Sequence, residues 1–293
     1  MFFLQILLTS LVTGTEVLLL AAGLYVIYAI ARFFHIGLGA MMIAGGYGFY
    51  VFNEAHLPFW MAFLGGLFVG ALLGMLSFYL LEPFIKKNQQ LLALLTSTAF
   101  GIVIESSLAI KFGSEGKFLV NAVLPTFDFF GLRITQIGLW TLITGIIVAI
   151  LAWIFIYLLP YGRVLRAISQ HRQCASLIGI KEKKVQLLIF MAVGIIAALI
   201  GILTGMNDAV TPVAGLDPIA MAFMALLIGG VSDFRGTVLA SYLIVLIPEL
   251  IVAGTYGDLS FNASWKMVFM FLIALVALSL RPQGIFQTTQ RKS

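Results

Sequence analysis

The stretch "LLIFMAVGIIAALIGILTGM", residues 187–206, contains no charged side chain and is almost entirely apolar. The charged run "KEKK" (181–184) precedes it, and Asn207 and Asp208 follow it. The hydrocarbon core of a bilayer is about 30 Å thick and a helix rises about 1.5 Å per residue, so about 20 apolar residues cross it. This stretch therefore predicts a transmembrane helix with polar ends.

The same pattern recurs along the whole chain. The 293 residues are 61% hydrophobic and 10% charged, with a mean hydropathy of +1.10, whereas soluble domains carry about 25% charged residues. We expect an all-α polytopic membrane protein in which residues 1–293 form a single transmembrane domain. About nine membrane segments are expected, within a range of about eight to ten. They lie near 5–31, 36–52, 58–81, 89–111, 137–159, 187–206, 219–231, 237–254 and 264–280.

The segment at 219–231 is short for a straight crossing and ends in Gly229 and Gly230, which predicts a short or broken span. It is nevertheless counted as a crossing. With nine crossings and the N-terminus outside, 13 of the 17 Lys and Arg residues fall on the inner side. Such a bias follows the positive-inside rule. It predicts an outer N-terminus and a cytoplasmic C-terminus, and it explains the net charge of +5 without nucleic acid.

Cysteine and histidine give no sign of a metal centre. Cys174 is the single cysteine, which excludes an internal disulfide and a cysteine-based metal cluster. His35, His56 and His171 fall on different loops or span ends, so no two of them have the spacing of metal ligands. We expect no metal site in this chain.

Three carboxylates fall within predicted spans: Glu16, Glu105 and Glu249. A charge at the centre of a membrane helix costs about 2.5–3.5 kcal/mol, so such residues face protein or water. Small and polar residues accompany them on the same helix faces. One interpretation is a packing interface with satisfied acids; the other is a translocation path. The candidate path residues are Glu16, Ser97, Gly101, Glu105, Ser241 and Glu249.

The predicted cytoplasmic loop at about 160–186 holds six of the 17 basic residues. Its helical wheel separates an apolar face from a basic and polar one. The apolar face holds Val164, Ile168, His171, Ala175 and Ile178, and the opposite face holds Arg163, Arg166, Gln170 and Gln173. The pattern fits a helix lying on membrane lipids or a helix docking into the groove of a cytoplasmic partner.

The loop sequence "GRVLRAISQHRQCASLIGI" (162–180) resembles the cytoplasmic loop of permeases of the branched-chain amino-acid ABC importer family. Further similar stretches are "LLTSTAF" (94–100), "ALLIGGVSDFRGTVLASYLI" (225–244), "PELIVAGTYGD" (248–258) and "RPQGIF" (281–286). They match the family through Gly229, Gly230, Gly236, Glu249, Leu250, Pro282, Gly284 and Ile285. Near the N-terminus only His35 and Gly39 resemble the family's pattern.

The resemblance implies that this chain is the inner-membrane permease of a bacterial or archaeal importer and not an enzyme. Two cytoplasmic ATPase subunits would bind ATP and Mg²⁺, since this chain lacks a GxxxxGK[ST] loop. A second, homologous permease is expected to form a heterodimer with it. The resemblance assigns coupling to the ATPases to Gly162, Arg163, Arg166, Ala167, Ile168, Ala175, Gly179 and Ile180.

On the outer side, the resemblance implies an extracytoplasmic solute-binding protein. The loop 112–136, with "FDFFG" at 127–131, is either its docking surface or an ordinary outer loop with an apolar patch.

Transport by alternating access, driven by the ATPases, is the expected mechanism. The spans offer hydroxyl and aromatic groups without basic clusters, so the expected solute is small and neutral or zwitterionic, such as a branched-chain amino acid, an amide or urea. The alternative is a secondary transporter or channel, which also uses broken helices but needs no docking loop. An intramembrane enzyme would require a clustered acid–base or metal set such as HExxH, which the sequence lacks.

The predicted sidedness is tested at Cys174, which lies in the cytoplasmic loop. A membrane-impermeant maleimide should label Cys174 in permeabilised cells and leave it unlabelled in intact cells. Labelling of intact cells from the exterior would invert the assigned topology.

Overall fold

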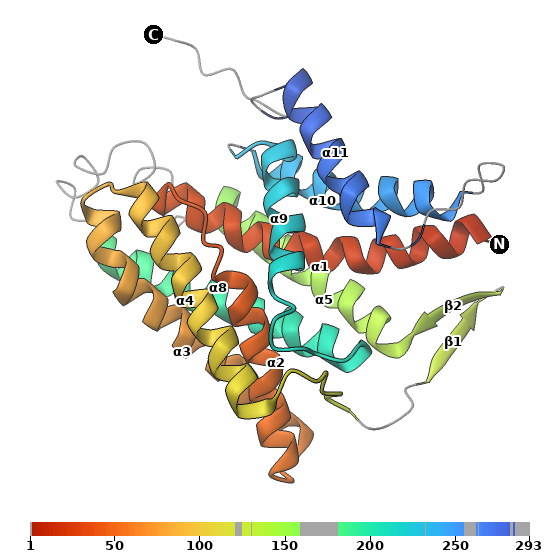
Figure 1. Ribbon diagram of the computed structural model, residues 1–293, viewed down its shortest axis with the longest axis horizontal. Helices are drawn as coiled ribbons and strands as arrows, with labels where there is room; N and C mark the ends of the chain where they lie inside the picture. The colour runs from red at the N-terminus through yellow and green to blue at the C-terminus, as the bar shows by residue number, and fades with distance from the viewer. Residues whose placement is uncertain are drawn as a thin grey trace. The chain divides into compact units, whose positions relative to one another are not determined.

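The computed structural model describes residues 2–120, 125–129, 131–158, 181–231, 233–254, 262, 264–281 and 284. Helices dominate this part of the chain (Figure 1). They are α1 (Phe2–Ala31), α2 (Leu38–Glu54), α3 (Phe59–Lys86), α4 (Gln90–Phe112), α5 (Gln136–Trp153) with the π-helix Ile154–Leu158, α8 (Glu182–Asn207), α9 (Leu216–Gly229), α10 (Phe234–Ala253) and α11 (Trp265–Leu280). Two strands, β1 (Thr126–Phe129) and β2 (Leu132–Thr135), lie between α4 and α5.

Each predicted apolar segment overlaps one of these helices, so the predominantly helical architecture is confirmed. Among the described residues, six helices are long and apolar enough to span a membrane: α1, α3, α4, α5 with its π-helical extension, α8 and α10. Helices α9 and α11 are apolar but shorter. The number of crossings therefore remains a prediction.

The largest differences between the predicted apolar segments and the observed helix boundaries occur at two charged helix ends. Helix α3 continues to Lys86 and α8 already begins at Glu182, each five residues beyond the predicted apolar segment. Lys and Glu are good helix formers, so a helix can continue through such residues.

The expectation of an all-α chain is corrected by the hairpin of β1 and β2. The strands pair antiparallel with Asp128 opposite Arg133, and the Asp128 Oδ1 lies 3.3 Å from the Arg133 Nε. Gly131 has φ +82°, a conformation that favours glycine. The Gln5 side chain of α1 donates to the Arg133 carbonyl at 2.8 Å and accepts from its N–H at 2.9 Å. The hairpin is thus attached to the N-terminal helix.

The described contacts divide the chain into two compact units. Unit 1 comprises Met1–Tyr25, Val123–Ala149 and Ala220–Ser293, and unit 2 comprises Val26–Ala122 and Ile150–Ile219. The single transmembrane domain expected from the sequence remains a prediction.

Unit 2 is built around α2, α3 and α8, which pack closely on one another (Figure 1). Glycines at four-residue intervals, Gly66, Gly70 and Gly74, form one stripe on α3. A Cβ atom added to Gly70 would overlap the carbonyl oxygen of Gly194 on α8, and one added to Gly74 would overlap that of Phe190. Small residues allow such backbone contact, which gives membrane helices their van der Waals attraction.

In unit 1, glycines that carry the family resemblance lie together around the turn from α9 to α10. A Cβ atom on Gly236 would overlap the Gly229 carbonyl, and one on Gly284 would lie 2.5 Å from the Gly230 Cα. Gly230 and Gly284 both have positive φ, +100° and +88°. Asp233 caps α10 by accepting a hydrogen bond of 2.9 Å from the Arg235 N–H. The glycines that carry the family resemblance therefore allow the backbones of α9, α10 and the segment at Gly284 to meet closely.

The packing of α3 against α8 is tested by Gly70→Val. The new side chain would meet the Gly194 backbone, and overpacking of this kind costs about 1–3 kcal/mol. We expect a lower midpoint of thermal unfolding in detergent, followed by size-exclusion fluorescence. Leu72→Val is the matched control, because Leu72 is 48% exposed on the opposite side of the helix. Equal stability of both variants would contradict this packing.

Candidate functional site

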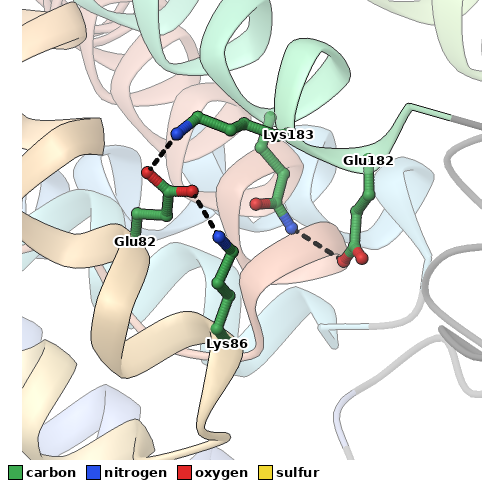
Figure 2. Close-up of polar contacts among 5 residues, drawn as sticks. Glu82, Lys86, Glu182 and Lys183 are labelled. Carbon is green, nitrogen blue, oxygen red and sulfur yellow. Dashed lines mark hydrogen bonds and ion pairs between the residues drawn. The ribbon is translucent and has the colours of Figure 1, made fainter.

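A charged cluster joins the end of α3 to the beginning of α8 (Figure 2). Glu82 Oε1 lies 2.8 Å from Lys86 Nζ, and Glu82 Oε2 lies 2.9 Å from Lys183 Nζ. Each carboxylate oxygen thus has one lysine partner. The Glu82 side chain is only 11% exposed, whereas those of Lys86 and Lys183 are 65% and 54% exposed. We call these three residues the Glu82 cluster.

The position of Glu82 follows from the helix period. Glu82 lies eight residues after Gly74 and therefore on the buried face of α3. Pro83 follows it within the helix and has no N–H to donate to the Tyr79 carbonyl, which weakens the last turns of α3. The Lys183 ammonium lies 5.6 Å from the Tyr79 ring centroid, within the range of a cation–π contact. Side chains of α8 thus support this end of α3.

The first turn of α8 has a further hydrogen bond. The Gln186 amide donates to Glu182 Oε1 at 3.0 Å, a pair four residues apart on the helix (Figure 2). Gln186 itself is buried, with 4% of its surface exposed. This turn is therefore held both within α8 and, through Lys183, against α3.

The cluster lies where the predicted coupling loop enters a helix. The assigned coupling residues, from Gly162 to Ile180, lie outside the described residues. The end of the predicted loop, from Glu182, forms the beginning of α8. Glu82 was not among the candidate residues predicted from the sequence, although it lies four residues before Lys86, and this spacing predicts an ion pair on a helix.

On α4, Ser97 is fully buried and holds the segment between α1 and α2. Its hydroxyl accepts a hydrogen bond of 3.1 Å from the Gly37 N–H and lies 2.5 Å from His35 Nδ1. His35 is buried beside the Phe190 ring. Burial lowers the pKa of His35 to about 3, so the imidazole is neutral at physiological pH. His35 and Ser97 thus contribute a buried polar contact within unit 2.

The other two α4 candidates differ in their surroundings. A Cβ atom on Gly101 would lie 3.2 Å from the Gly37 Cα, so this glycine serves close packing of α4 on the segment before α2. Glu105 is only partly buried. Its Oε1 would lie 2.7 Å from a Cβ atom on Gly215, which places the carboxylate beside the turn before α9.

The remaining candidates, Glu16, Ser241 and Glu249, belong to unit 1. Ser241 is buried and donates to the Thr237 carbonyl within α10 at 2.8 Å. The Glu249 oxygens lie 2.8 and 2.6 Å from Lys266 Nζ, which joins α10 to α11. Glu16 is partly buried on α1. The structure thus gives Ser241 and Glu249 defined partners within their own unit.

A cavity of about 780 Å³ lies at the end of α2 in unit 2. Its lining is Tyr50, Asn53, Glu54, His56, Gly116, Lys117, Phe118 and Leu119. Asn53 Nδ2 donates to the Leu119 carbonyl at 3.1 Å, and Lys117 exchanges two backbone hydrogen bonds of 2.9 Å with Val210. The beginning of the predicted outer loop is therefore attached to α2 and to the segment after α8.

The described part of the chain offers little to a metal ion, since it contains no group of three or more His, Cys, Asp or Glu residues placed to hold one.

Comparison with known proteins identifies the family. Residues 6–278 match the family model described as "Branched-chain amino acid transport system / permease component". The chain is 28% identical to a probable branched-chain amino acid transport permease protein LivH of Methanocaldococcus jannaschii, over 74% of this chain and 71% of that protein. It is 22% identical to the high-affinity branched-chain amino acid transport system permease protein LivH of Salmonella typhimurium, over 97% and 96%.

A solved structure has a similar fold. PsaBC from Streptococcus pneumoniae in complex with Fab aligns with a TM-score of 0.50 and 16% identity, covering 94% of this chain and 91% of that one. At this identity the likeness concerns the fold alone. The family match extends over nearly the whole sequence, from the first helix to the last. The chain therefore belongs to the permease-component family of branched-chain amino acid transport systems.

Proposed function

We propose that the chain is the membrane-spanning subunit of an ATP-binding-cassette importer that moves a small neutral or zwitterionic solute by alternating access. The observation that carries this proposal is the family match over residues 6–278. Its relatives are named as permeases of branched-chain amino acid transport systems, so a branched-chain amino acid is the first solute to test. Amides and urea belong to the same proposed class.

The proposed assembly has partners on both membrane faces. Two ATPase subunits that bind ATP and Mg²⁺ dock on the loop before α8, and a homologous permease completes the membrane part as a heterodimer. The proposed topology places the N-terminus outside and the C-terminus in the cytoplasm. The Glu82 cluster then faces the cytoplasm, with two lysines around one carboxylate, as the positive-inside rule favours.

The opposite end of unit 2 is the proposed receiving surface for the solute-binding protein. Helix α8 is 26 residues long, or about 39 Å at about 1.5 Å per residue, so its two ends lie on opposite sides of a bilayer core. The cavity lined by Glu54, His56 and Lys117 adjoins its C-terminal side through the pairing of Lys117 with Val210. The lining contains an acidic and a basic side chain, Glu54 and Lys117, which suits contact with a polar protein surface.

For the translocation path, Glu105 is the strongest α4 candidate. Ser97 is buried and bonded to His35 and Gly37, and Gly101 is packed against the backbone, so both serve helix packing. The Glu105 carboxylate is partly exposed and can meet the ammonium group of an amino acid.

The proposed docking of ATPases is tested by affinity purification of the tagged chain in mild detergent. Stoichiometric ATPase subunits should accompany the wild-type chain and be lost from the double variant Arg166→Asp, Ala175→Asp. Arg291→Asp with Ser293→Asp is the control, because it changes the net charge equally near the C-terminus. A purified chain that transports in liposomes without ATP or partners would instead establish the secondary-transporter alternative.

The proposed roles of Glu105 in the translocation path and of Ser97 in helix packing are tested by comparing Glu105→Gln with Ser97→Ala. We expect Glu105→Gln to raise the KM of solute uptake with little change in thermal stability. Ser97→Ala should leave KM unchanged and lower the stability by about 1–3 kcal/mol, because the buried Gly37 N–H loses its acceptor. Ser107→Ala is the control, since Ser107 is exposed on the same helix and donates its hydrogen bond to the Val103 carbonyl within that helix. A changed KM in Ser97→Ala would place Ser97 in the path.

A further inference from the structure

The contacts between α3 and α8 follow one antiparallel register toward the Glu82 cluster. Gly70 meets Gly194 and Gly74 meets Phe190 through backbone atoms. The Phe78 and Phe190 rings follow at 5.6 Å between centroids, and the register ends with the ion pair of Glu82 and Lys183. Charged side chains thus complete a series of contacts that is otherwise apolar.

The glycine contacts join α3 and α8 into a closely packed pair. A backbone carbonyl occupies the space of each missing Cβ, so the two backbones touch directly, and close packing of this kind transmits displacement from one element to the next. The first turn of α8 precedes these contacts along the chain, so it needs a connection of its own to be held directly against α3.

The two lysines of the cluster differ in what they connect. Lys86 and Glu82 lie four residues apart on the same helix, so their ion pair joins nothing beyond α3. Lys183 lies on α8, only a few residues after the proposed docking loop, and its 2.9 Å contact with Glu82 joins the two helices. Figure 2 shows both ammonium groups reaching the one carboxylate from different helices.

We propose that Glu82 and Lys183 are positioning residues for energy coupling: their ion pair fixes the start of α8 against α3 and passes movement of the docking loop to the helices of unit 2. This inference rests on the proposed function, because it requires ATPase subunits that move the loop. Glu82 is largely buried and holds Lys183 within hydrogen-bonding distance, whereas an exposed surface pair of this kind has little effect.

The test uses the intact importer, purified with its ATPase subunits and reconstituted with its binding protein in liposomes. Solute uptake and ATP hydrolysis are measured together, and uptake per ATP is compared among variants. Lys183→Gln should lower uptake per ATP about fivefold or more, within the usual range of coupling between sites. ATP hydrolysis and the recovery of ATPase subunits should persist, because Lys183 is half exposed and its replacement leaves Glu82 paired with Lys86.

Lys86→Gln is the matched control. It removes the same charge from the same carboxylate but breaks only the contact within α3, so uptake per ATP should stay within about twofold of wild type. Lys183→Arg keeps the charged bond and should restore coupling. Glu82→Gln should resemble Lys183→Gln, and the double variant should show no further loss of coupling, since both changes remove the ion pair between Glu82 and Lys183.

Two outcomes would overturn the inference. One is a Lys183→Gln importer that loses thermal stability while uptake per ATP stays at the wild-type value, which makes the pair structural only. The other is equal uncoupling by Lys86→Gln. Failure of the proposed function is distinguishable, because the wild-type importer would then show no ATP-dependent uptake before any variant is compared.

Discussion

The backbone contact between α3 and α8 is the constraint on which the rest of unit 2 depends. Among lipids, apolar side chains gain little by leaving the bilayer, so helices associate through close van der Waals packing and polar contacts. Gly70 and Gly194 provide that closeness by offering no side chain on either surface. Helix α2 packs against both members of this pair, and the Glu82 cluster joins the end of α3 to the beginning of α8.

Carboxylates in both units are paired next to a proline. Glu82 precedes Pro83 on α3 and is bound by two lysines; Glu249 follows Pro248 on α10 and is bound by Lys266. A proline within a helix leaves one backbone carbonyl without its usual donor. An ion pair to the neighbouring helix gives the weakened turn a side-chain connection, so both sites are suited to hold one helix end against another.

The helices were predictable from the sequence and their partners were not. Apolar length located each of these helices, because a bilayer imposes such a length on the segments that cross it. The glycine stripe on α3 was not predicted, and nothing in the sequence specified Gly194 as the residue opposite Gly70. Glu82 was missed because it follows the apolar run at 58–81, and Lys183 lies about a hundred residues further along. The hairpin at Thr126–Thr135 was missed because its alternation spans only four residues per strand.

The glycine stripe also bears on how far related sequences can diverge. Contact with Gly194 and Phe190 restricts only a few positions of α3, whereas Leu72, Met75 and Leu76 on its other faces are exposed and need only remain apolar. Most of the helix can therefore exchange one apolar residue for another without disturbing its neighbours. A permease that shares 22% of its residues with a relative can keep a common architecture, since the architecture is specified by a small, discontinuous set of side-chain-free positions.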